Sequence, residues 1–246
     1  MNAAKIPIGN NTSWEKELSE TAYKYHYIGS WVAITFNLIF SLNDYFNVNE
    51  YWLLFFYVRY AVSFITLLVL LLHKPLKISS EYLIFVPFLL ISIQNAFMWS
   101  FMDAPHMLKH TLAYIALFIG AGMLILWKIQ FSIAVVVLSL LANVVCLSLN
   151  SQLTLDEILI DGGILTFSVA VFSILLIQTR YKLTVKEIKA RLALEKSNET
   201  LNFQKLVIEE KTTKIEDSIK YAKRIQDAIL PSKEFLDEVT PNYFIY

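Results

Sequence analysis

The sequence predicts an all-α protein, a six-transmembrane helix bundle that continues into a cytoplasmic signalling helix able to form a parallel coiled coil. Three observations predict this fold class. Apolar residues make up 56% of the 246 residues, above the roughly 45 to 50% of soluble domains, and the mean hydropathy is +0.51. Six apolar stretches lie before residue 180. The remaining 67 residues hold 13 of the 21 basic and 11 of the 21 acidic residues, so an apolar first part of the chain is followed by a part rich in charged residues.

Composition also excludes several classes of protein. Six glycines and six prolines are too few for a low-complexity or collagen-like chain, and a single cysteine excludes a disulfide scaffold. The formal net charge is zero and no basic block occurs, which argues against nucleic acid as a partner. The partner that this composition predicts is the lipid bilayer.

A helix needs about 20 apolar residues to cross the hydrocarbon core of a bilayer. Six stretches approach or reach this length, with polar residues between them. The predicted spans are 27–42, 51–73, 82–102, 106–127, 131–149 and 158–179. Residues 1–26 are then a cytoplasmic N-terminal segment, and 27–179 are a six-span membrane sensor domain.

The distribution of basic residues predicts the orientation of the spans, because Lys and Arg are retained on the cytoplasmic side. With the N-terminus inside, the inner loops and segments before the tail carry six lysines: Lys5, Lys16, Lys24, Lys74, Lys77 and Lys128. The outer loops carry mainly acidic residues, with Lys109 as the basic exception: Asp44, Glu50, Asp103, Asp156 and Glu157. The sequence therefore predicts a multi-pass protein of the cytoplasmic (inner) membrane with both termini in the cytoplasm.

Residues 180–230 contain no glycine and no proline. The last span can therefore continue as a cytoplasmic helix of about 50 residues, roughly 75 Å long. Apolar residues at every seventh position predict one line of a coiled-coil seam and therefore a homodimer: Leu194, Leu201, Ile208, Ile215, Ala222 and Ile229. The companion line is polar at four of its five positions: Asn198, Lys205, Thr212, Ile219 and Gln226. Such a seam is weak. It is either a dimerisation stalk or a bistable stalk that passes a twist or register change from the membrane.

The end of the tail carries a specific phrase, YAKRIQDAILP at residues 221–231, within the run 216–246. This run resembles the segment that leads into PPM-type serine/threonine phosphatases of the sporulation stage II protein E class. The positions that match are 219, 221–226 and 228–231, and 243–246 resemble the opening of the first strand of the phosphatase. The resemblance implies that the chain is the sensor and linker of a larger receptor, with no catalytic residues of its own, and that 231–246 begin a truncated phosphatase domain.

The six-span part resembles the membrane sensor of quorum-sensing histidine kinases and membrane-anchored adenylyl cyclases. The resemblance rests on the six spans without large loops and on the phrase NEYWLLFFYVRY, which places Arg59 inside the second span. A charge there needs a partner or a route to water, and Asp161 and Asp103 are the candidate partners on the same side. Arg59 either reaches the outer headgroups along its own side chain or anchors an anionic ligand or cofactor group.

All four histidines lie at predicted span ends: His26 and His73 inside, His106 and His110 outside. His26 and His73 come from different helices and could ligate the iron of a heme b from both faces. His106 and His110 are four residues apart on one helix, so they could bind a small metal, or one of them could supply a single heme ligand while Arg59 holds the propionates. The alternative is that all four bind water and headgroups at the interface.

Transport is disfavoured as a function, because the predicted spans lack paired broken helices at mid-membrane. Two other functions remain. The first is a dimeric membrane receptor that responds to a small-molecule or redox stimulus, with a bound heme as one candidate sensing element, and controls a phosphatase. The second is a heme b electron-transfer or redox protein whose tail is an oligomerisation device. Polar residues within spans are interpreted as contacts between helices: Asn37, Gln94, Asn95 and Asn143.

Overall fold

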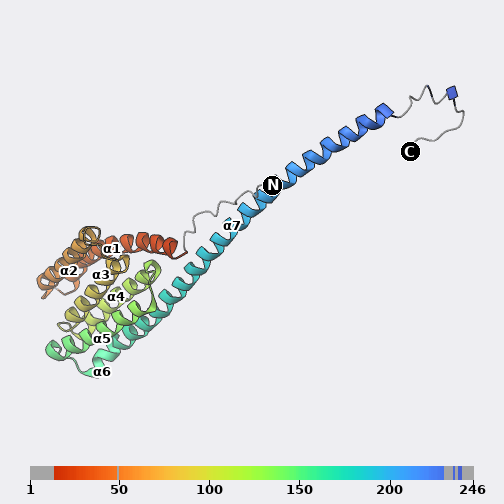
Figure 1. The fold of residues 1–246 in the computed structure, drawn as a ribbon. Helices are drawn as coiled ribbons and strands as arrows, with labels where there is room; N and C mark the ends of the chain where they lie inside the picture. Colours follow the sequence, from red (N-terminus) through yellow and green to blue (C-terminus); the bar gives the residue numbers. More distant parts are fainter. Residues whose placement is uncertain (1–13, 49, 230–234, 236–237, 240–246) are drawn as a thin grey trace. The chain divides into compact units, whose positions relative to one another are not determined.

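A computed structural model describes residues 14–48, 50–229, 235 and 238–239, and the side chains of 113, 117 and 121 lie outside this description. The described chain folds into helices joined by short connections (Figure 1). Its elements are α1 (Trp14–Asn47), α2 (Trp52–Leu72), α3 (Ser80–Trp99), α4 (Ala104–Leu124), α5 (Ile129–Asn150), α6 (Leu155–Ile158), the π-helix η1 (Leu159–Gly163) and α7 (Ile164–Ile229). The all-α fold class is therefore confirmed.

Five helices of the described chain are long and apolar enough to cross a membrane: α2, α3, α4, α5 and the stretch Leu155–Ile229. The protein is thus a multi-pass helical membrane protein. The first predicted span, 27–42, lies within α1, which is longer and more polar than α2 to α5 because it begins with Trp14 and the acidic Glu15 and Glu17. Acidic residues in a first turn stabilise a helix by interacting with its dipole.

The core of the bundle lies around α3, which packs against α1, α2 and α5. In its most apolar window 61% of residues are buried inside the protein, against 22% for α5. Aromatic side chains fill the space between α3 and the ends of α4 and α5, with Phe88 and Phe118 4.9 Å apart between ring centres and Trp127 stacked on Phe131. The predicted boundary of the fourth span at Trp127 is three residues beyond the end of α4, because 125–128 connect α4 to α5.

The last membrane helix begins with a break. Thr154 caps α6 through a reciprocal pair of contacts with Glu157, and a π-helical turn with two non-helical residues, Asp161 and Gly162, separates α6 from α7. Gly162 has φ of +147°, a value that side chains with a Cβ rarely adopt. The sequence predicted a span over 158–179, and the structure has this turn near its beginning because Gly162 permits it.

The chain divides into two compact units, Met1–Lys189 and Ala190–Tyr246. In the second unit the helix continues to Ile229 without a break, as the absence of Gly and Pro predicts. The apolar residues of the seven-residue line are exposed in the single chain, with Leu201 58% and Ile208 63% exposed. The predicted start of the phosphatase domain, 231–246, lies outside the described residues except for three positions.

Candidate functional site

Three charged or titratable side chains from different helices meet inside the bundle. Asp44 comes from the last turns of α1, Arg59 from α2 and His110 from α4. Arg59 Nε lies 2.5 Å from Asp44 Oδ2 and Nη2 lies 3.0 Å from Oδ1, so the guanidinium holds the carboxylate in a bidentate pair. His110 Nε2 lies 3.0 Å from Oδ1 of the same carboxylate, although the contact lacks the alignment of a hydrogen bond.

Two amide side chains extend this group toward α3. Arg59 Nη1 donates to Asn37 Oδ1 at 3.1 Å, and the same oxygen accepts a hydrogen bond from Gln94 Nε2 at 2.9 Å. Asn37 Nδ2 lies within 3.2 Å of the carbonyl oxygen of Arg59, of Ser63 Oγ and of Gln94 Oε1. The interpretation of Asn37 and Gln94 as contacts between helices is confirmed. We call Asn37, Asp44, Arg59, Gln94 and His110 the Asp44 cluster.

The Asp44 cluster is almost completely buried. Asp44 is 0% exposed, Arg59 6% and His110 3%. Arg59 therefore does not extend to the headgroups, and its partner is neither Asp161 nor Asp103 but Asp44, which the sequence analysis placed in an outer loop. The difference arises because α1 continues to Asn47 and carries Asp44 inside the bundle. A buried guanidinium without a counter-charge costs several kcal/mol, so the pairing accounts for Arg59 within a membrane helix.

A small cavity adjoins the Asp44 cluster between α1, α2, α3 and α4. Its volume is about 30 Å³, and its walls combine polar and aromatic side chains: Phe40, Asn43, Arg59, Ile91, Gln94, Asn95, His110 and Tyr114. The amide nitrogen of Asn95 is buried and has no hydrogen-bond partner within the protein. We call this space the Asn95 cavity. It exceeds the roughly 10 to 15 Å³ that one water molecule requires.

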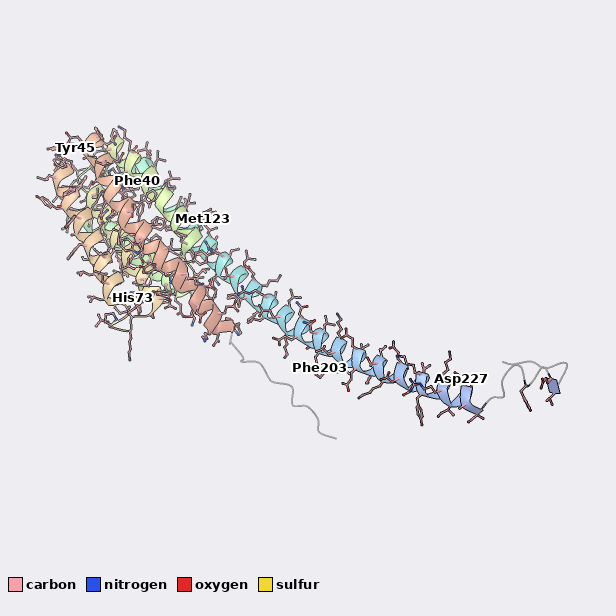
Figure 2. All side chains as sticks on the ribbon, turned by 90° about the horizontal axis from the view of Figure 1, so that it is seen from above. Phe40, Tyr45, His73, Met123, Phe203 and Asp227 are labelled. Atoms are coloured by element: carbon pink, nitrogen blue, oxygen red, sulfur yellow. The ribbon has the colours of Figure 1, made fainter. Side chains whose placement is uncertain are left out.

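His26 and His73 lie toward the opposite end of the bundle from the Asp44 cluster. Figure 2 shows Phe40 and Tyr45 toward one end and His73 toward the other, and Phe40 contacts Arg59 with 5.9 Å between the ring centre and Cζ. His26 is 0% exposed, its Nδ1 lies 3.0 Å from the carbonyl oxygen of Ser80, and its Nε2 accepts the backbone N–H of Leu126 at 3.2 Å. Both ring nitrogens of His26 are therefore engaged.

The ring of His73 is engaged in the same way. Its Nδ1 lies 2.6 Å from the carbonyl oxygen of Leu70, and its Nε2 lies 3.2 Å from the hydroxyl of Tyr23 on α1. A nitrogen that ligates iron must offer it a lone pair, and these hydrogen bonds use the lone pairs of both rings. The two histidines do not fit the ligation of a heme in this arrangement. Heme b stays a prediction that would require His26 and His73 to exchange buried hydrogen bonds for iron.

His106 and His110 share α4 but face different partners. His106 pairs with the exposed Asp103 at the start of the helix, whereas His110 is buried against Asp44. Among the described residues no group of three or more His, Cys, Asp or Glu side chains could hold a metal ion. The backbone N–H of His106 donates to Asp103 Oδ1 at 3.0 Å, and this hydrogen bond holds the pKa of Asp103 below its usual range. Asp103 is thus an N-terminal cap of α4.

Thr111, the residue after His110 on α4, contacts the non-helical turn that precedes α7. The hydroxyl of Thr111 is buried without a hydrogen-bond partner and lies against Gly162, where a Cβ would overlap it. Further along α4, Gly122 faces Leu176 of α7, and a Cβ there would lie 2.7 Å from Leu176 Cδ2. Gly122 thus permits a close approach of α4 to Leu176, while a Cβ at Gly120 would have no neighbour within 4 Å.

Sequence analysis missed Asp44 and Thr111 as members of the buried core. A signal for Asp44 was present, because Asn37 and Asp44 are seven residues apart and therefore lie on one face of a continuous helix. No comparable signal marks Thr111. Comparison of the chain with protein-family models, with curated proteins and with solved structures finds no match.

Proposed function

We propose that this chain is the membrane-embedded sensor and transducer region of a bacterial signalling receptor. In this proposal the Asp44 cluster is the sensing site and α7 carries its state out of the membrane. The observation that carries the proposal is the continuity of α7, which runs from an apolar segment at Ile164 to a charged one at Ile229 without a break. A membrane protein that only binds a cofactor has no use for so long a helix.

The proposal includes α1 as a sixth membrane span, over 27–42. Apolar and aromatic side chains on α1 remain exposed although the helix packs against α2 and α3: Tyr27, Ile28, Trp31, Phe36, Ile39 and Leu42. Contact of this apolar surface with lipid is favourable, whereas its contact with water is unfavourable. The burial of Asp44 against Arg59 also favours a common depth for α1 and α2. The bias of Lys and Arg supports an inner-membrane location with both termini in the cytoplasm.

The tail acts in this proposal as a switchable parallel homodimer. An isolated helix gains little stability in water, and the exposed line from Leu194 to Ile229 would be covered by the same line of a second copy. The polar companion line keeps the seam weak, which lowers the cost of changing its register or twist. The resemblance of 221–231 to the segment before PPM-type phosphatases supports a phosphatase as the output, regulated by the tail. Heme b is the alternative sensing element, and it would require His26 and His73 to give up their present hydrogen bonds.

Disulfide cross-linking tests the dimer in a Cys146→Ser background, since Cys146 is the single cysteine of the chain. Leu201→Cys and Ile208→Cys should each form an inter-chain disulfide in membranes. Lys196→Cys and Glu210→Cys, on the opposite side of the predicted seam, should not. Equal cross-linking at all four positions, or at none, would contradict the parallel stalk.

A separate test addresses the output. The codons after Tyr246 in the native gene should encode a domain with the metal-binding aspartates of a PPM-type phosphatase. A stop codon there would contradict the assignment of phosphatase output and leave the dimer proposal to the cross-linking result.

A further inference from the structure

The inner part of α1, residues 14–25, lies before the predicted first span. Four of its side chains share one face of the helix, because they are spaced by four, four and three residues: Trp14, Leu18, Ala22 and Tyr25. Leu18 and Ala22 are buried, at 9% and 6% exposed. This face therefore packs against another part of the protein.

The part of α7 that follows the membrane span contacts this face. Nζ of Lys189 lies 4.2 Å from the centre of the Trp14 ring. Cζ of Arg180 lies 4.8 Å from the centre of the Tyr25 ring. The earlier residue of α1 contacts the later residue of α7, so the two helices run antiparallel here. The two cation–π contacts are about ten residues apart, or about 15 Å, and together they fix the position and the rotation of α7.

The corresponding part of α7 has a face of the same kind. Four side chains follow the same spacing of four, four and three residues: Ile177, Tyr181, Val185 and Ile188. Ile177 and Ile188 are buried, with Ile188 4% exposed, and the two side chains between them are half-buried. Contacts within the chain thus cover this face of α7.

The proposed dimer seam lies on a different side of α7. Continued backward by seven residues from Leu194, the seam line reaches Glu187, which is exposed. Ile188 is the next residue, and neighbouring residues are about 100° apart around an α-helix. The apolar line of α7 therefore changes phase at the base of the tail, and it is buried before the change and exposed after it.

The inner half of α1 is also attached to the inner ends of other helices. The hydroxyl of Tyr23 lies 3.2 Å from Nε2 of His73 at the end of α2. Both ring nitrogens of His26 contact backbone groups, one at the start of α3 and one in the connection between α4 and α5. Because α1 is one unbroken helix of 34 residues, it also carries Asp44. The helix α1 therefore connects the Asp44 cluster to the base of α7.

We infer that residues 14–25 are a clamp that holds α7 and limits where the parallel stalk begins. While the clamp is closed, the face with Ile188 is covered and the seam can start only at Leu194. When the clamp opens, this face is free to pack against the same face of a second copy, and the seam extends toward the membrane. Because the two apolar lines differ in phase, the extension changes the winding of the stalk. This inference rests on the proposed function, since it takes the exposed line of the tail as the seam of a dimer, and it names a regulation of that seam.

Maleimide labelling of Ile188→Cys tests the clamp without requiring a second copy. The full chain carries Cys146→Ser in lipid nanodiscs, and the thiol should react slowly while the clamp is closed. Leu18→Glu should raise the labelling rate about tenfold or more, because burial of a carboxylate at an apolar position is unfavourable. Ser19→Glu is the matched control, since it places the same charge at the next, exposed position and should leave the rate unchanged. Val135→Cys in the core of the bundle should stay unlabelled in both variants, which distinguishes an open clamp from an unfolded protein.

Disulfide formation between copies in membranes tests the effect on the stalk. The inter-chain disulfide at Ile188→Cys should increase in Leu18→Glu but not in Ser19→Glu, because only the open clamp lets the seam extend. Leu201→Cys should form its disulfide in both variants. Faster labelling without more disulfide at Ile188→Cys would overturn the control of the stalk. Loss of the disulfide at Leu201→Cys in every variant would contradict the dimer proposal instead, and the labelling result would still decide the clamp.

Trp14→Ala/Tyr25→Ala opens the clamp by a second route and keeps the test decisive if Leu18→Glu fails to fold. This double variant should raise the labelling rate of Ile188→Cys about fivefold or more, as expected for the loss of two cation–π contacts. Equal rates in Leu18→Glu and Ser19→Glu would overturn the inference. A rate in the double variant equal to that of the otherwise unchanged protein would overturn it as well.

Discussion

Replacing Asp44 by Asn tests the central interaction of the bundle. The substitution keeps the size of the side chain and removes its charge, so Arg59 stays buried, at 6% exposed, without its counter-ion. Arginine does not lose its proton in proteins and therefore cannot relieve the cost by becoming neutral. Breaking a buried ion pair in this way costs about 3 to 5 kcal/mol. We expect Asp44→Asn to lower the free energy of unfolding by about that amount.

Removing the arginine of the pair instead should lower the free energy of unfolding by less. In Arg59→Met the carboxyl of Asp44 is left without the guanidinium, but it can accept a proton, and His110 still lies 3.0 Å away. The stability of this variant should therefore increase as the pH is lowered, whereas that of Asp44→Asn should not. The double variant Asp44→Asn/Arg59→Met should recover most of the loss, because it leaves no unpaired charge in the core.

Steric trapping in bicelles measures the free energy of unfolding of these variants under native conditions. Glu210→Gln is the matched control, since its ion pair with Lys214 is exposed on the tail and should not affect stability measurably. If Asp44→Asn costs no more than Arg59→Met, or if the double variant is as unstable as the sum of the two single variants, the reasoning about the buried pair is wrong.

Three further predictions concern other sites. Gly162→Ala should lower the free energy of unfolding by about 1 to 3 kcal/mol, because φ is +147° and the new Cβ would overlap Thr111. Gly120→Ala should be neutral or stabilising, since its Cβ position has no neighbour within 4 Å. Equal effects of the two substitutions in the same steric-trapping assay would contradict this reasoning. The hydrogen bond from the backbone N–H of His106 lowers the pKa of Asp103. The cap of α4 should therefore be intact above the ordinary carboxyl pKa of about 4 and lost as the pH falls through the lower pKa of the folded protein. A rate of amide exchange at His106 that shows no added loss of protection over this pH range would contradict the cap. Protein purified from heme-replete cells should lack a low-spin bis-histidine absorption spectrum, and a Soret band lost in His26→Ala would show that His26 exchanges its hydrogen bonds for iron.

The helical class, the apolar helices and the length of the tail follow from the sequence alone, because they depend on local properties. About 20 consecutive apolar residues are sufficient to predict a membrane helix, and the absence of Gly and Pro between Gly163 and Pro231 is sufficient to predict an unbroken one. Gly162 was the exception, since a glycine near the start of a span predicts neither a break nor its φ value.

The composition of the candidate site was decided by tertiary structure. The sequence indicated that Arg59 needs a partner and named Asp103 and Asp161, whereas Asp44 becomes the partner only once the length of α1 and the packing of α1 on α2 are known. The histidines likewise suggested a shared role by their positions along the chain, and the structure separates them because each ring finds a different neighbour. Pairing between helices depends on rotation and depth in the bundle, and spacing along one helix does not encode either quantity.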